Sequence, residues 1–385
     1  MRLNSWLNAV AHDDPWDVIV LGAGPAGAVA ARQLALAKLR VLLIEKASLP
    51  RFKVCGGCLG GAALHVLENI GLGHLPAQCG GAPLDRMELA NAGSIASIPV
   101  GRCVAVCRRE FDELLVNEAA NAGAVVYDGV EGMLPSLEDY SGRGDVRPVK
   151  LRRGGSECVV FGRAVIIATG LAGCPSPFKS QTSTGSLIGL GALLECDRRF
   201  TRAGMLQMGC SASGYVGVAP LGDGRLDIAA AVDPRTLAAV GSASRLIDRI
   251  LRESGLPAPE NVNAVHWRGT PPLTRTTRPL AAHRCLLVGD AAGYVEPFTG
   301  EGIGWAMQSA LLASSIVLKN IESWSEAVTE QWQHTYDSVL LSHQRTCRTI
   351  TRLLRHATVR RLTLWSLRRA PVLARPLVHR LQRPL

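Results

Sequence analysis

The feature that most constrains the fold is a glycine pattern that directly follows a short apolar run near the N-terminus. The pattern reads Gly22-x-Gly24-x-x-Gly27. The run before it, Asp17–Leu21, is β-branched and apolar after its first residue, as expected of a buried parallel strand. An Ala-rich helix is predicted over 26–38 and a second strand over Val41–Glu45. Together they form a unit of about 30 residues, which predicts a parallel sheet with right-handed crossovers.

Each glycine of this pattern has a separate role in a dinucleotide site. The first permits a tight turn, the second lets the backbone approach a pyrophosphate, and the third lets helix and strand pack closely. The unpaired N–H groups and the dipole of the helix start favour an anion there. Glu45 ends the second strand, 18 residues after Gly27, and is placed to accept hydrogen bonds from ribose hydroxyls. The residues expected to bind an adenine dinucleotide are Gly22, Gly24, Pro25, Ala26, Gly27, Glu45 and Lys46.

A second segment far downstream completes this site. A buried strand is predicted over 286–288, and Asp290 follows it, where its carboxylate can accept from a ribityl hydroxyl or simply cap a helix. Gly300 and Gly302 precede an apolar helix predicted over 303–321, which begins at Ile303. The N-terminus of that helix would point at the N1–C2=O edge of a flavin and stabilise negative charge on it. The two glycine-lined helix starts therefore predict that the chain holds FAD.

The sequence also argues against a membrane-spanning protein, a secreted disulfide-bonded protein and a metal site. No apolar run reaches about 20 residues, so no membrane-spanning helix is expected. Residues 1–10 lack the apolar stretch of a secretory signal. The eleven cysteines show no framework, so we expect reduced thiols and a cytoplasmic location. No metal site is expected, because Cys55 and Cys58 lack the further ligands that zinc needs.

Three segments resemble the geranylgeranyl reductase family. They are Pro50–Leu59 with its Cys-Gly-Gly sequence, Arg108–Leu115 with Arg-x-x-Phe-Asp, and Pro297–Ala310. The family is one group of the p-hydroxybenzoate-hydroxylase-like flavoproteins, which also include aromatic hydroxylases and flavin halogenases. The resemblance implies that Arg108 contacts FAD and that the loop Cys55–Leu59 lies near the isoalloxazine.

The resemblance also implies an α/β fold with interleaved domains. A Rossmann-like FAD-binding domain of the GR2 type would alternate with a mixed β-sheet substrate domain, and a helical tail would follow. The expected FAD-binding domain comprises residues 15–75, 102–180 and 275–322. The expected substrate sheet comprises 76–101, with a hairpin over 86–100, and 181–274. Residues 323–385 are expected to form a basic helical C-terminal region, broken by Pro371 and Pro376.

The implied activity is an FAD-dependent reduction of a carbon–carbon double bond. The substrate would be hydrophobic, isoprenoid or polyketide-like, and NAD(P)H or a carrier protein would supply electrons. Cys55, Tyr215 or water would supply the proton, although Cys55 can instead shape its loop or have a redox role, and Tyr215 can be a core residue. Small residues at 216–219 replace the aromatic ones that the family tends to have, which indicates a bulky substrate.

Two other functions stay open. The first is an FAD-dependent monooxygenase that hydroxylates an aromatic or lipid phenol. Against it, Ala168-Thr169-Gly170 stands where many hydroxylases have an Asp-Gly pair. The second is a non-catalytic flavin-binding scaffold on membranes.

The positive charge lies almost entirely in the tail. The net charge is +10, and after Asp337 the chain has eleven arginines and no acidic residue. The arginines that share one helix face, at spacings of three and four, are Arg345, Arg348, Arg352 and Arg355. A basic amphipathic helix followed by Trp365 is typical of a membrane surface, and the alternative is a covering helix with solvated arginines. Nucleic-acid binding is not expected, and the oligomeric state stays open.

Overall fold

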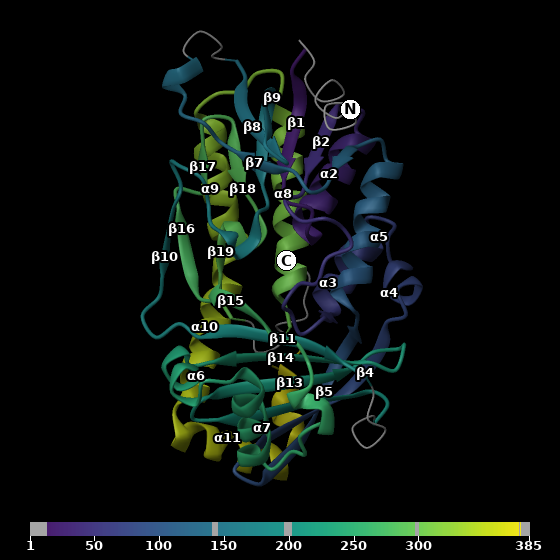
Figure 1. The fold of residues 1–385 in the computed structure, drawn as a ribbon, viewed down its shortest axis with the longest axis vertical. Coiled ribbons are helices and arrows are strands. Elements are labelled where there is room, and N and C mark those ends of the chain that lie inside the picture. Colours follow the sequence, from purple (N-terminus) through teal and green to yellow (C-terminus); the bar gives the residue numbers. More distant parts are fainter. Residues whose placement is uncertain (1–13, 141–144, 196–201, 297–299, 377, 379–385) are drawn as a thin grey trace.

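A computed structural model describes residues 14–140, 145–195, 202–296, 300–376 and 378. Two large sheets form the molecule (Figure 1). The strands of one run along the long axis in the upper half, and the strands of the other cross beneath it. A column of C-terminal helices runs along one side (Figure 1). The predicted α/β architecture with a second sheet and terminal helices is confirmed.

The upper sheet is built around the N-terminal strand. Its path is β17 (Ala281–Ala282), β18 (Cys285–Leu287), β9 (Ser156–Ile167), β1 (Trp16–Leu21), β2 (Val41–Ile44) and β6 (Val125–Tyr127). β7 (Glu131–Met133) and β8 (Arg147–Arg153) extend it antiparallel from β9. Val18 pairs in parallel with Val41 on one side and Ala164 on the other, so β1 is central, as its continuous apolar run predicts.

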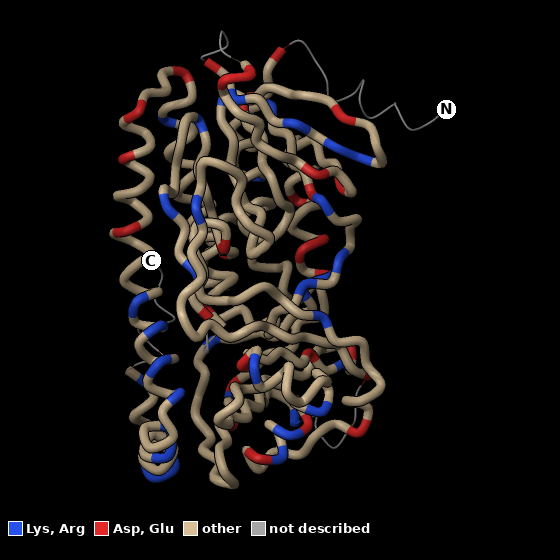
Figure 2. Tube along the Cα trace, turned by 60° about the vertical axis from the view of Figure 1, so that its left-hand side comes forward, with Lys and Arg blue, Asp and Glu red and all other residues tan. Residues whose placement is uncertain are grey.

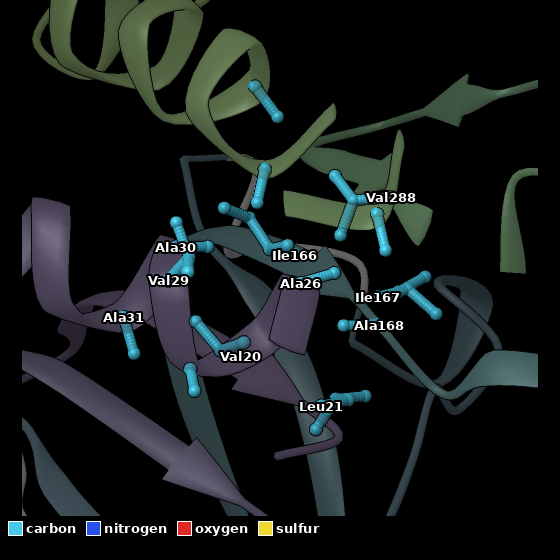
Figure 3. Close-up of a cluster of buried hydrophobic side chains, with 14 of the residues drawn as sticks. Val20, Leu21, Ala26, Val29, Ala30, Ala31, Ile166, Ile167, Ala168 and Val288 are labelled. Atoms are coloured by element: carbon cyan, nitrogen blue, oxygen red, sulfur yellow. The ribbon is translucent and has the colours of Figure 1, made fainter. Parts of the chain in front are cut away.

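Helices cover the parallel strands. They are α2 (Pro25–Leu36), α5 (Arg108–Asn121) and α8 (Gly302–Asn320), with the shorter α3 (Gly61–Asn69) and α4 (Leu75–Gln78) nearby. Figure 3 shows Val29 and Ala30 of α2 beside Val20 of β1 and Ile166 of β9, with α8 above them. The alanines of α2 let the helix approach the sheet closely, which brings the glycine pattern to the carboxyl end of β1.

The lower sheet is mixed. Its order is β15 (Arg268–Pro272), β11 (Ile188–Leu194), β14 (Leu226–Val232), β13 (Gly214–Pro220), β12 (Met205–Ser211), β4 (Ala82–Asn91), β5 (Ser94–Ala105) and β3 (Cys58–Gly60). The predicted hairpin is confirmed, because β4 and β5 pair antiparallel up to Asn91 and Ser94. One face packs against α7 (Ala243–Ser254), beside α6 (Pro234–Val240), through residues such as Ile228 and Ile250. On the opposite face, residues of β13 and β14 line a cavity, while β4 and β5 are covered by a C-terminal helix.

A third sheet was not predicted. It consists of β10 (Lys179–Thr182), β16 (Arg275–Arg278) and β19 (Gly293–Tyr294). Short 3-10 turns complete the described chain: η1 (Glu138–Tyr140), η2 (Gly170–Ala172), η3 (Glu260–Asn263), η4 (Gly289–Ala291) and η5 (Pro371–Ala374).

The C-terminal region is helical, as predicted, but its breaks differ. The helices are α9 (Ala327–Val339), α10 (Leu341–Arg355) and α11 (Ala357–Arg369). Breaks at Leu340 and His356 were not predicted. The expected break at Pro371 is confirmed, because α11 ends at Arg369 and η5 follows, whereas the residue after Pro376 lies outside the described part of the chain. Figure 2 shows acidic residues along α9 and basic residues along α10 and α11. α11 packs on β4 and β5, so this region covers the lower sheet.

Candidate active site

One cavity of about 1630 Å³ joins the two large sheets and the C-terminal helices. Its first end contains the glycine pattern and Glu45, and its middle contains Asp290 and the free face of β13 and β14. Its far end is lined by apolar residues of α10 and α11, including Leu354 and Leu367. Most of the lining is therefore contributed by segments far apart in the sequence.

The glycine pattern has the shape of a dinucleotide cradle. A Cβ on Gly27 would lie 1.8 Å from the carbonyl oxygen of Gly22, and one on Gly22 would lie 2.4 Å from that of Ala168. A Cβ on Gly24 would meet only the Arg51 guanidinium, at 3.6 Å, so it would point into the cavity. Gly24 therefore leaves open space where the sequence analysis expects a pyrophosphate, while the other two glycines permit close packing. The residues present fit FAD.

Glu45 is held by a hydrogen-bonded network. Its Oε2 accepts from the Ala23 N–H at 2.9 Å, and Arg51 donates to the same oxygen at 3.3 Å. Arg51 also donates to Asp112 at 3.2 Å, and Asp112 accepts two bonds from Arg108, at 2.8 and 2.9 Å. Burial lowers the pKa of Arg108, but the Asp112 carboxylate raises it above its ordinary value overall. This network connects two predicted cofactor residues through Arg51 and Asp112, which sequence reasoning did not select.

The other predicted residues at this end also line the cavity. Pro25 is the first residue of α2, and Ala26 follows it. Lys46 lies at the rim with its side chain 73% exposed, and its ammonium pairs with Glu131 at 2.6 Å.

The predicted flavin end brings together the second glycine segment and the Cys-Gly-Gly loop. Asp290 lies in η4, Gly302 begins α8, and Ile303 is buried beside them. Gly300 has φ +87°, and a Cβ there would lie 3.1 Å from that of Cys58. Burial raises the pKa of Asp290, and the charge of the nearby Lys53 opposes this rise. Pro297, Phe298 and Thr299 of the predicted signature lie outside the described residues.

Both predicted catalytic residues line the same cavity. Cys55 is half-buried and lies close enough to Arg108 to influence the pKa of that guanidinium. Tyr215 lies on β13, and burial raises its pKa well above the ordinary value, so its phenol stays protonated. The buried Glu296 and Tyr294 both lie within electrostatic range of this phenol. Glu296 and Tyr294 were not selected from the sequence.

Asp227 is a further carboxyl that sequence reasoning missed. It lines the cavity from β14 and is only 5% exposed. Burial raises its pKa to about 8, against the opposing effect of Arg108. The only sequence signal is one acidic residue in an otherwise apolar strand, Leu226–Val232.

The far end of the cavity opens to the surface between the C-terminal helices. Leu353, Leu362 and Leu373 line the cavity and are also 48%, 65% and 59% exposed. The apolar face of α10 that was predicted from sequence therefore forms a wall of this cavity.

Three findings on helices, cysteines and metal-binding side chains apply only to the residues that the structure describes. No described helix is long and apolar enough to cross a membrane. The ten described cysteines are all free thiols. Among the described residues, no group of three or more metal-binding side chains is found.

Comparisons with known proteins agree with an FAD-binding function for this part of the chain. The FAD binding domain family matches residues 15–157. Digeranylgeranylglycerophospholipid reductase 2 of Methanothermobacter thermautotrophicus is 30% identical over 325 residues, which cover 80% of this chain and 79% of that protein. The geranylgeranyl bacteriochlorophyll reductase-like protein of Thermoplasma acidophilum has a similar fold, with a TM-score of 0.68, 18% identity, and coverage of 94% of this chain and 98% of that one.

The same fold occurs in an oxygenase. The p-nitrophenol 4-monooxygenase of Pseudomonas putida has a TM-score of 0.78 and 15% identity, and the match covers 94% of this chain and 96% of that one. Fold and cradle together define the protein as an FAD-dependent oxidoreductase. Within that class, the chain belongs to the geranylgeranyl reductase family.

Proposed function

We propose that this protein reduces a carbon–carbon double bond of a hydrophobic, isoprenoid or polyketide-like substrate. The proposal is supported by the names of relatives, which are reductases of digeranylgeranyl lipids. It is supported further by the lining of the cavity, where apolar residues from the lower sheet and from α10 and α11 continue directly from the cofactor cradle. That continuity is the observation on which the proposal depends most, because a long apolar chain needs such a chamber beside the flavin.

The roles of the residues follow from their positions. Bound FAD would supply the two-electron redox chemistry. Gly22, Gly24, Pro25, Ala26 and Gly27 would hold its pyrophosphate, with Glu45 and Lys46 near the ribose. Asp290, Gly300, Gly302 and Ile303 would surround the flavin, and Arg108 would contact it from α5. Cys55 and Tyr215 are proposed to contact the substrate and to orient it.

The small side chains above the flavin support a bulky substrate. Gly217 and Ala219 of β13 line the cavity, as do Ala229 and Ala231 of β14. A Cβ on Gly217 would make only ordinary contacts, the nearest with Met208 at 3.5 Å. This part of the cavity is therefore wide because its residues are small.

We propose NAD(P)H or a reduced carrier protein as the electron donor. We further propose that the cavity mouth docks on a membrane surface. Trp365 and Val372 are 58% and 53% exposed, and the Arg369 guanidinium lies 4.0 Å from the centre of the Trp365 ring. Basic residues follow α10 and α11 (Figure 2). Apolar anchors within a basic surface favour anionic lipid.

The direct test is product analysis without oxygen. The purified FAD-loaded protein is photoreduced and mixed anaerobically with geranylgeraniol. The molecular mass of the product is then measured by mass spectrometry. A gain of two hydrogen atoms supports double-bond reduction. A product that forms only with oxygen and gains one oxygen atom would support the monooxygenase instead.

A further inference from the structure

The cavity-facing residues of β13 and β14 form a roof with a single carboxyl. These residues are Tyr215, Gly217, Ala219, Asp227, Ala229 and Ala231. Successive side chains of a strand point to opposite faces, and Leu226 and Ile228 pack on the other side of β14 toward α7. Asp227 is therefore turned toward the cavity, although it occupies an apolar strand.

The carboxyl of Asp227 lies against the Cys-Gly-Gly loop. A Cβ built on Gly57 would lie 2.8 Å from its Oδ2, and one built on Gly56 would lie 3.8 Å from the Cβ of Ala229. The next residue, Cys58, lies beside Gly300 at the start of α8. Asp227 is therefore beside the loop that the family resemblance locates near the isoalloxazine.

Within the described part of the chain, this carboxyl has no dedicated partner. Among the described residues no hydrogen bond to it is found, and the cations that act on it, Arg108 and Arg225, are bonded to other carboxylates. The nearest titratable thiol is Cys58 of β3, which lies within electrostatic range of Asp227, of Cys103 on β5 and of Cys55 in the loop. A buried acid without a partner costs stability, and in a cavity such a group indicates a functional role.

We propose that Asp227 is a catalytic residue that protonates the substrate from the roof of the cavity. This inference rests on the proposed double-bond reduction. One alkene carbon accepts a hydride with its electron pair from the reduced cofactor, whose electrons come from a nicotinamide or a reduced carrier. The other carbon accepts the proton as the O–H bond of Asp227 breaks. The carboxylate that remains regains a proton from water, so the reaction is balanced.

The test compares the FAD-loaded native protein with Asp227→Asn, which keeps the shape and lacks the acid. Asp223→Asn is the control, because Asp223 lies on the same hairpin but outside the cavity lining. The proteins are photoreduced and mixed anaerobically with geranylgeraniol. Asp227→Asn should retain its FAD and its rate of reduction, and it should be reoxidised about 100-fold or more slowly. The control should match the native protein.

A second readout needs no substrate. A folded-state pKa near 8 means that the folded chain holds this proton more tightly than the unfolded chain does, so stability is lost as the pH rises from about 4 toward 8. The melting temperature of the native protein should therefore fall relative to that of Asp227→Asn across this range. The native reoxidation rate should also fall above about pH 8.

The outcomes are distinguishable. Equal reoxidation of native protein and Asp227→Asn, or a flat native pH profile, would overturn the assignment of Asp227 alone. The assignment would also be overturned if the melting temperatures of the native protein and Asp227→Asn depended on pH in the same way, because Asp227 would then hold no proton at neutral pH. A native protein that is never reoxidised by geranylgeraniol, although the melting curves diverge, would overturn the proposed reduction and the catalytic role with it.

Discussion

Arg355 of α10 donates a hydrogen bond to Oε2 of Glu296 at 3.2 Å. Glu296 is 1% exposed, and its backbone carbonyl accepts further bonds from Cys347 and Thr351 of the same helix. α10 is thereby fixed to the segment that leads from η4 toward α8, so the chamber wall and the cofactor site are connected.

Removing the positive charge of Arg355 should destabilise the fold in a pH-dependent way. Burial raises the pKa of Glu296, and Arg355 opposes the rise. Arg355→Met should raise that pKa further, so stability should be lost as the pH rises above the unfolded value of 4.5. We expect a loss of about 2 kcal/mol at pH 8, reduced by the partial exposure of Arg355, and almost none near pH 5. Urea denaturation of both proteins at pH 5 and pH 8 measures this loss of unfolding free energy.

The matched control is Arg352→Met, on an exposed part of the same helix. It should change stability little at either pH. Equal losses in the two variants would contradict a specific role for the Glu296–Arg355 pair.

Two glycine variants separate cofactor binding from packing. Gly24→Ala meets no protein atom closer than 3.6 Å, so the protein should fold normally but bind FAD at least about tenfold more weakly, a cost of about 1.4 kcal/mol. Gly27→Ala would bring a Cβ within 1.8 Å of the Gly22 oxygen, so the fold itself should suffer. FAD titration and melting curves of the apoprotein distinguish the two. Unchanged FAD affinity in Gly24→Ala would contradict the pyrophosphate site.

Membrane docking depends on the exposed apolar residues beside the cavity mouth. Trp365 and Val372 do not line the cavity, so the double variant Trp365→Ser, Val372→Ser should leave FAD binding intact. We expect at least about tenfold weaker binding to anionic vesicles in a sedimentation assay. Leu36→Ser, which changes a residue 48% exposed at the end of α2, is the control. Docking would be rejected if the double variant bound as the native protein does.

Local patterns made much of the fold predictable. Gly22-x-Gly24-x-x-Gly27 predicted β1 and α2, and the Asn91–Gly93 turn predicted the β4–β5 hairpin, because both depend on neighbours in sequence. The residues predicted to bind FAD line one cavity for the same reason, because most stand at the end of a strand or the start of a helix; the exception is Gly27, which packs against Gly22.

Long-range contacts made the rest unpredictable. The break at His356 has no proline or glycine, and α11 is held in place because Arg360 bonds to Asn91, far away in sequence. The arginine pattern predicted a helix face but not that Leu354 on the other face would line the cavity. Asp227 is one polar residue in an apolar strand, and only the tertiary structure reveals that it faces a ligand cavity.

The central claim is that a single cavity holds FAD and an apolar chain together. The most direct test compares anaerobic flavin reoxidation by geranylgeraniol in the native protein and in Gly217→Trp. A Cβ at this position makes only ordinary contacts, the nearest at 3.5 Å, and we expect the indole beyond it to fill the space above the flavin. We predict that both proteins bind FAD and that only the native one is reoxidised quickly. No reoxidation of the native protein, or equal rates in both, would contradict the claim.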